Sequence, residues 1–268
     1  LRWLVEHYYR SAEYRRLADS TKRVKRGILD KLCEEHGAMP FVPLESRHVR
    51  MLRDKKAEFP EAANSIVKAL RQVFKYAVET GKADCNPARD VPLFPPSAEG
   101  FHTWSIEEVW QFEARHPIGT KARLAMALLL YTGVRRSDVV RLGPQMERRT
   151  QDGEFLCFRE MKGQDKQIKD REIPILPELR IVLDAFASNH LNYITTEFGK
   201  PFTPPGFGNW FRRRCNEAGL TNCSAHGLRK AGATIAADNG ATEHQLMAMY
   251  GWDSPKQAAI YTRKANRK

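Results

Sequence analysis

The sequence lacks the features of a membrane-spanning or disulfide-stabilised protein. Its most apolar run, residues 124–131, is far shorter than the roughly 20 residues that cross a bilayer, and we expect no signal peptide. The five cysteines are odd in number and include no CxxC pair, as is usual for a reduced intracellular protein. We therefore expect a cytoplasmic protein with no membrane partner, in which residues 124–131 form a buried helix.

Clustered metal ligands are also missing from the sequence. Carboxylates do not gather at the ligand spacing of a metal-dependent nuclease, which argues against that class of enzyme. Cys215, Cys223 and His226 lie near one another, but their spacing matches no common zinc site and a fourth ligand is not evident. We predict that the protein needs no metal and no cofactor.

What the sequence does have is an excess of positive charge. Its 268 residues include 44 Lys and Arg against 32 Asp and Glu, so the formal net charge is +12. Such an excess favours a polyanionic partner, of which nucleic acid is the commonest. Charge alone is equally compatible with a basic surface that keeps the protein soluble. The 42% of hydrophobic residues suffice for a buried core, in one large domain or two ordinary ones.

Residues 1–90 show helical periodicity. Helices are predicted at 21–35, where apolar residues recur at spacings of four (Val24, Ile28 and Leu32), and at 65–80, where Gly81 stands at the expected end. The exposed face of the first helix carries four basic residues: Lys22, Arg23, Lys25 and Arg26. This face predicts contact with a DNA backbone, and a merely solvated helix face is the alternative.

A change of composition separates this helical part from the rest of the chain. Residues 91–102 contain Pro92, Pro95 and Pro96, which cannot continue a helix, so this segment is predicted to be a linker. Soon after it, Ser105 and Glu108 have the spacing of a capping box, which predicts the start of a new helix.

The remaining residues, 103–268, mix helices and strands. Two strands are predicted at 155–159 and 168–175, with a polar hairpin turn between them. Helices are predicted around them, including 208–218, 228–238, 242–250 and one that starts at Ser254-Pro255. The expected fold is mainly α with a small antiparallel β-sheet, in a helical domain and an α+β domain.

Several residues of 103–268 are of the types that phosphodiester chemistry requires. Negative charge gathers on the non-bridging oxygens in the transition state, and arginines match that geometry. A hydroxyl nucleophile keeps the bond energy in a covalent ester, so rejoining needs no ATP. The candidates occur in TGVRRSD (132–138), at Lys162 in the hairpin, in HGLRK (226–230), in Gly251-Trp252, and at Tyr261.

These segments, in this order, resemble the catalytic signature of the tyrosine recombinases, or phage integrases. The resemblance covers residues 103–268. It extends more weakly to the first part, because a helix that ends at Gly81 and is followed by Asn86-Pro87 is similar to the end of the family's core-binding domain. It implies a helical core-binding domain over 1–90 and an integrase-type catalytic domain over 103–268.

The resemblance also implies how the phosphate would be held. Arg135 and Arg229 would clamp it, and Trp252 would donate its indole N–H to it. His226 would either form a hydrogen bond with the phosphate or assist proton transfer with the tyrosine. Asp138, at a position that is more often glutamate in the family, would support the first arginine. Trp252 stands where many members have histidine, and Lys230 stands where a second histidine is usual.

The chemical step would involve two further residues. Tyr261 would attack phosphorus to give a 3′-phosphotyrosine and a free 5′-hydroxyl, and Lys162 would protonate the leaving oxygen. Tyr250 competes as nucleophile but precedes Gly251-Trp252, so we expect it to be a core residue.

The implied function is site-specific DNA recombination without ATP or metal, with duplex DNA as partner, a tetramer on DNA and a place on the nucleoid. The state without DNA stays open, as do the target site and the choice between integration, excision, resolution and inversion. A DNA-relaxing type IB topoisomerase and a catalytically vestigial DNA-binding regulator are the alternatives. Because the chain begins at Leu1, we expect a fragment, and whether an upstream arm-site DNA-binding domain belongs to the full protein stays open.

Overall fold

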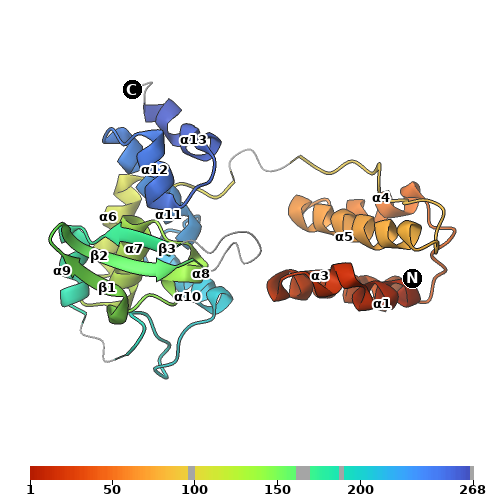
Figure 1. Cartoon of the computed structure of the whole chain (residues 1–268), viewed down its shortest axis with the longest axis horizontal. Helices are drawn as coiled ribbons and strands as arrows, with labels where there is room; N and C mark the ends of the chain where they lie inside the picture. The colour runs from red at the N-terminus through yellow and green to blue at the C-terminus, as the bar shows by residue number, and fades with distance from the viewer. Residues whose placement is uncertain (96–99, 161–169, 187–189, 266–268) are drawn as a thin grey trace. The chain divides into compact units, whose positions relative to one another are not determined.

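The chain divides into two units, Leu1–Gly100 and Phe101–Lys268, and each has its own hydrophobic core. The computed structural model describes residues 1–95, 100–160, 170–186 and 190–265, and Figure 1 shows its helices and strands. The division after Gly100 falls inside the segment expected to be a linker, 91–102. None of the helices among the described residues combines the length and the apolar character needed to cross a membrane.

Unit 1 is all-helical in its described residues. Its elements are α1 (Arg2–Arg10), α2 (Ala12–Arg15), α3 (Asp19–His36), α4 (Ser46–Asp54) and α5 (Pro60–Glu79). Helix α5 begins before the predicted start at residue 65, because Pro60 occupies its first turn, where a missing N–H costs nothing. The apolar residues whose spacing predicts this helix are Ile66, Leu70, Val73 and Ala77; the last three are fully buried, and Ile66 is half-buried.

The predicted apolar stripe of α3 is wrong at its first position. Val24 is 63% exposed, whereas Leu29, Leu32 and Cys33 are buried. An α-helix has 3.6 residues per turn, so positions spaced by four drift around the helix and leave the face that packs on α1 and α5. The buried face therefore follows 29, 32 and 33 rather than 24, 28 and 32.

The first residues of the expected linker pack on unit 1. Val91 is fully buried in the core of that unit. The Asn64 side chain accepts a hydrogen bond from the Phe94 backbone N–H at 2.8 Å and donates one to the Phe94 carbonyl at 2.9 Å. The Arg53 guanidinium carbon lies 4.5 Å from the centroid of the Phe94 ring. These contacts hold residues 91–94 as an extended strap against the helices.

Unit 2 combines helices with a small antiparallel sheet, which confirms the predicted fold class. The described strands pair in the order β1 (Glu147–Thr150), β2 (Gly153–Arg159), β3 (Asp170–Pro174), with Leu156 opposite Ile173. The helices are α6 (Ile106–Arg115), α7 (Lys121–Thr132), α8 (Arg136–Val139), α9 (Pro177–Asp184), α10 (Pro204–Glu217), α11 (Ala225–Asp238), α12 (Glu243–Tyr250) and α13 (Pro255–Ala265), with a 3-10 turn at Pro144–Met146.

Local end signals explain several of these bounds. The Ser105–Glu108 capping box is formed at the start of α6, and Gly133 closes the buried helix α7 in the left-handed conformation (φ +59°). Helix α10 begins earlier than predicted because Thr203 caps it and prolines fill its first turn. Helix α11 likewise begins at Ala225 rather than 228, since Ser224 is its cap.

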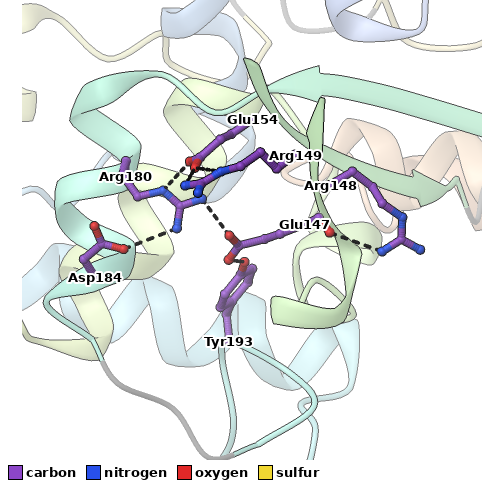
Figure 2. A network of polar contacts seen from close by, with 7 residues as sticks. All are labelled: Glu147, Arg148, Arg149, Glu154, Arg180, Asp184 and Tyr193. Atoms are coloured by element: carbon purple, nitrogen blue, oxygen red, sulfur yellow. Dashed lines mark hydrogen bonds and ion pairs between the residues drawn. The ribbon is translucent and has the colours of Figure 1, made fainter. Parts of the chain in front are cut away.

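An ion-pair network fastens α9 to the sheet (Figure 2). Arg180 on α9 contacts Glu154 on β2 at 2.8 Å, Glu147 on β1 at 2.6 Å and Asp184 on its own helix at 3.2 Å. The Tyr193 hydroxyl donates to Glu147 as well. One arginine thus joins two strands and a helix.

Candidate active site

Arg229 connects two turns of unit 2 that contain the left-handed glycines Gly133 and Gly251. It lies on α11 and is 6% exposed. Its Nη1 donates to the carbonyl of Gly133, after α7, and its Nη2 donates to the carbonyl of Tyr250, at the end of α12. Burial, and then the charges of Arg135 and Arg171, lower the pKa of the Arg229 guanidinium to about 10. The group therefore remains a cation at neutral pH.

Arg135 lies close to this buried guanidinium. It is the N-cap of the short helix α8, in extended backbone two residues after Gly133. Its Nη1 forms an ion pair with the carboxylate of Glu160, while 26% of its side chain remains exposed. Asp138 is buried at 2% exposure on α8, and its backbone N–H donates to the Arg135 carbonyl at 2.9 Å. The two arginines predicted to act together thus share one charged cluster.

An aromatic stack brings the predicted nucleophile to the same place. The rings of Trp252 and Tyr261 are stacked, with centroids 5.3 Å apart and planes 8° apart. Trp252 also stacks on Tyr250 at 4.9 Å, and the Arg229 guanidinium carbon lies 5.2 Å from the Tyr250 ring centroid. Burial raises the pKa of Tyr261, while the positive charge of Arg229 opposes that rise.

Tyr250 is a core residue, as its place before Gly251 predicts. It is 2% exposed, and a side chain at Gly133 would collide with its ring. Its pKa is raised by burial, although Arg229 acts against this. The hydroxyl lies deep between α7 and α11, because a Cβ on Gly232 would come within 2.8 Å of it.

His226 lies one helical turn before Arg229, in the first turn of α11. It is exposed, and its ring lies 4.7 Å from that of Phe101, at the start of unit 2. Lys230, one turn further along, donates to the Phe101 carbonyl at 2.5 Å. The segment that enters unit 2 therefore packs beside the predicted phosphate-binding histidine.

Lys162 lies outside the described residues.

The four basic residues predicted to face DNA all lie on α3 of unit 1, and three of them make contacts within that unit. Lys22 pairs with Asp19 at 3.2 Å, Lys25 donates to Gln72, and the Arg26 guanidinium carbon lies 4.9 Å from the Tyr9 ring centroid. Beside them, a groove between α3 and α5 is lined by residues that include Val24, Lys25 and Lys68.

Two charged residues of this site were missed by the sequence analysis. Glu160 directly follows β2 and its side chain is 3% exposed; Arg171 is on β3 and its side chain is 7% exposed. The signal for Arg171 was present: it occupies an inward position of a strand whose burial alternates, where a charge needs a partner. That partner could not be read from spacing, because it depends on how β2 pairs with β3.

One group in the described part of the chain could hold a metal ion: His102, Glu108 and Cys223, whose donor atoms lie within 4.8 Å of one another. These donors already have protein partners. The Glu108 carboxylate accepts from the Ser105 backbone and from His102, each at 2.7 Å. The capping box and an ion pair thus account for the group. Burial raises the pKa of the Cys223 thiol to about 12.

Comparison with known proteins places this arrangement in a family. Residues 103–268 match the Phage integrase family. The chain is 25% identical to the integrase of Mycobacterium phage L5 over 97% of this chain and 72% of that protein. It is 23% identical to the integrase of Mycobacterium phage FRAT1 over 76% of this chain, and there it spans slightly less than two thirds of the relative's length, 66%.

Solved structures share the fold. A lambda integrase dimer bound to a COC′ core site superimposes with a TM-score of 0.82, at 16% identity, over 100% of this chain and 97% of that chain. The Tn1549 transposon integrase in complex with circular intermediate DNA gives a TM-score of 0.76, at 16% identity, over 99% of this chain and 98% of that one. Because the family match covers more than half of its 268 residues, the chain belongs to the phage integrase family, the tyrosine recombinases.

Proposed function

We propose that this protein is a site-specific DNA recombinase that cuts and rejoins DNA strands through a covalent bond to Tyr261. One observation carries the proposal: Tyr261 stacks on Trp252 and interacts electrostatically with Arg229, whose guanidinium shares a charged cluster with Arg135. A nucleophile beside two guanidiniums is the arrangement that phosphoryl transfer through a protein ester requires.

In the proposed reaction, Arg135 and Arg229 neutralise the charge that develops on the non-bridging oxygens, and Trp252 donates its indole N–H to one of them. The Tyr261 oxygen forms a bond to phosphorus as the bond to the 5′-oxygen breaks. His226 takes the tyrosine proton, and Lys162 gives a proton to the leaving oxygen. Attack by a 5′-hydroxyl reverses these steps and restores the phosphodiester, so no external energy is consumed.

We further propose that residues 1–90 bind core DNA, that residues 91–102 link the two domains and that residues 103–268 perform the chemistry. The basic face of α3, in unit 1, supports a DNA backbone contact. The proposed working assembly is a tetramer on duplex DNA at the nucleoid. Lambda integrase has been seen as a tetramer bound to a Holliday junction, which supports this assembly for a chain of the same fold.

The test is covalent capture of DNA. A pool of random-sequence duplexes, each nicked on one strand, selects the crossover site, because loss of the short fragment beyond the nick traps the cleaved strand on the protein. We expect the native chain to form a denaturant-resistant adduct in EDTA, and Tyr261→Phe to bind the same DNA without forming one. Absence of an adduct with the native chain, or an adduct with Tyr261→Phe, would refute the proposal. Relaxation of plasmids that lack the selected site would favour a topoisomerase instead.

A further inference from the structure

A single buried carboxylate lies between two arginines at the base of the candidate site. Oε1 of Glu160 accepts from Nη1 of Arg171 at 2.5 Å, and its Oε2 accepts from Nη1 of Arg135. With 3% of its side chain exposed, Glu160 is shielded from water on nearly all sides. Each carboxylate oxygen is thus assigned to a different guanidinium, and one of these belongs to a proposed phosphate-binding residue.

Arg171 is fully engaged at both ends of its guanidinium. While Nη1 binds Glu160, Nη2 donates to the carbonyl of Ala248 at 2.9 Å and to the carbonyl of Met249. Both carbonyls belong to the last turn of α12, directly before the Gly251-Trp252 turn. Arg171 therefore has a partner within the protein on each terminal nitrogen. It joins β3 to the end of α12.

Gly251 packs directly on this ion pair. It caps α12 in the left-handed conformation (φ +62°), and a Cβ added to it would meet the Arg171 guanidinium and lie 2.7 Å from Oε1 of Glu160. The turn that positions Trp252 therefore rests on the Arg171–Glu160 pair. This close approach is independent of the hydrogen bonds, and it points to the same connection.

We propose that Glu160 and Arg171 are positioning residues for the recombination reaction, which fix the guanidinium of Arg135 and hold the Trp252 turn against it. The inference rests on the proposed function, because it assigns a task in that reaction. Neither residue touches the phosphate. One carboxylate oxygen of Glu160 orients Arg135, and the other binds Arg171. Arg171 in turn binds the backbone of α12, so Arg135 and the Trp252 turn are held at a fixed separation.

The local charges support this assignment. Arg135, Arg171 and Arg229 gather in one cluster, and Glu160 opposes the effect of burial on the pKa of Arg229. Without the carboxylate, three guanidiniums would repel one another before any phosphate arrived. The carboxylate thus keeps the free site assembled. The alternative is that the carboxylate competes with the phosphate for Arg135. In that case Glu160→Gln would speed cleavage instead of slowing it.

The experiment measures single-turnover adduct formation on the captured site, at saturating DNA, well below the melting temperature of each variant. Glu160→Gln keeps the shape of the side chain and removes its charge. We expect it to slow cleavage by about 10²-fold, the order expected for a misplaced catalytic group, with DNA affinity within about 2-fold. Arg171→Lys keeps one charge for Glu160 but cannot also reach both carbonyls, so an intermediate rate is expected.

A double-mutant cycle separates positioning from general loss of structure. In an Arg135→Lys background, Glu160→Gln should slow cleavage by less than about 3-fold, because its effect passes through Arg135. Arg180→Met is the matched control: it breaks the ion-pair network of Figure 2, which also joins strands to a helix. It should lower the melting temperature and leave the cleavage rate of the folded protein unchanged.

Three results would overturn the inference: a Glu160→Gln rate equal to or faster than that of the native chain, multiplicative effects in the cycle, or a slowing by Arg180→Met as large as that by Glu160→Gln. Should Glu160→Gln fail to fold, the cleavage rates of Glu160→Asp and Arg171→Lys are compared with those of the native chain and Arg180→Met instead. Failure of the proposed function is distinguishable, because in that case the native chain itself forms no adduct.

Discussion

At the scale of single residues, the site depends on a cation that the fold buries. Arg229 is the hydrogen-bond donor to two backbone carbonyls from separate turns, and its charge lies where the proposed phosphate would bind. One guanidinium therefore both holds two turns together and supplies positive charge for the proposed phosphate. A planar group with several donors can meet both needs at once, whereas a single ammonium cannot.

Arg229→Lys tests this double role. A lysine satisfies one of the two carbonyls and leaves the other buried without its donor, which should destabilise unit 2 by about 1–3 kcal/mol. Adduct formation should fall by about 10²-fold or more, as for loss of a preorganised donor. Thermal unfolding and the capture assay measure the two effects. Arg136→Lys, a change at an exposed arginine beside Arg135, should produce neither.

Tyr250 makes a prediction about alkaline pH. Burial raises the pKa of its phenol in the folded protein above the unfolded value of about 10. A raised folded pKa contributes stability that is present below the unfolded pKa and is lost as the pH rises through the folded pKa. The native chain should therefore lose stability from about pH 10 upward, and Tyr250→Phe should lose less. Urea unfolding at a series of pH values decides this, and parallel curves for the two proteins would contradict it.

At the scale of elements, left-handed glycines set where the site residues begin. Gly133 ends α7 and allows the chain to turn directly into Arg135, with the Tyr250 ring packed against it. Gly251 does the same between α12 and Trp252. Helix ends, rather than helix faces, therefore supply two of the proposed phosphate contacts, and Arg229 binds the carbonyls at both ends.

Gly133→Ala should destabilise unit 2 by about 2 kcal/mol or more, because an alanine is strained at positive φ and its Cβ would collide with Tyr250. Gly27→Ala is the matched control. Gly27 lies within α3 with nothing within 4 Å of an added Cβ, so alanine should stabilise by about 0.5–1 kcal/mol. Denaturant unfolding measures both, and equal effects at the two glycines would refute the account of Gly133.

The elements themselves were largely predictable from the sequence, because their signals are local. The capping box at Ser105 predicted the start of α6, and the helix predicted at 242–250 matches α12 closely. The buried helix predicted at 124–131 is longer in the structure, because α7 begins at Lys121, after its cap Thr120. The start of α10 was misplaced, because prolines in a first helical turn resemble a break in the helix. Val24 was misassigned because a spacing of four does not by itself say which face a neighbour covers.

The site was predictable in part. The resemblance to a family indicated Arg135, Arg229, Trp252 and Tyr261, which the structure brings together. It did not indicate Glu160 or Arg171, since their pairing follows from the register of β2 and β3 and from the approach of α12, neither of which leaves a pattern in sequence. Contacts between segments that are remote in sequence could be identified only from the structure.

At the scale of the whole molecule, the excess of positive charge should govern DNA affinity. The net charge of +12 and the basic face of α3 predict binding that weakens steeply with salt. If Arg23 contacts one phosphate, Arg23→Gln should reduce the slope of log affinity against log salt by about 1. Lys75→Gln, at a lysine that pairs with Glu79 at 3.4 Å on α5, is the control. Titrations over a range of salt concentrations measure the slopes, and an unchanged slope for Arg23→Gln would remove that contact.

The side chain that becomes bonded to DNA defines the active site. Protease digestion of the captured adduct, followed by mass spectrometry of the peptide that retains a nucleotide, identifies that residue directly. We predict that the nucleotide is found on Tyr261 as a 3′-phosphate ester. A nucleotide on Tyr250, or on any residue outside the cluster of Arg135 and Arg229, would contradict the assignment of this site.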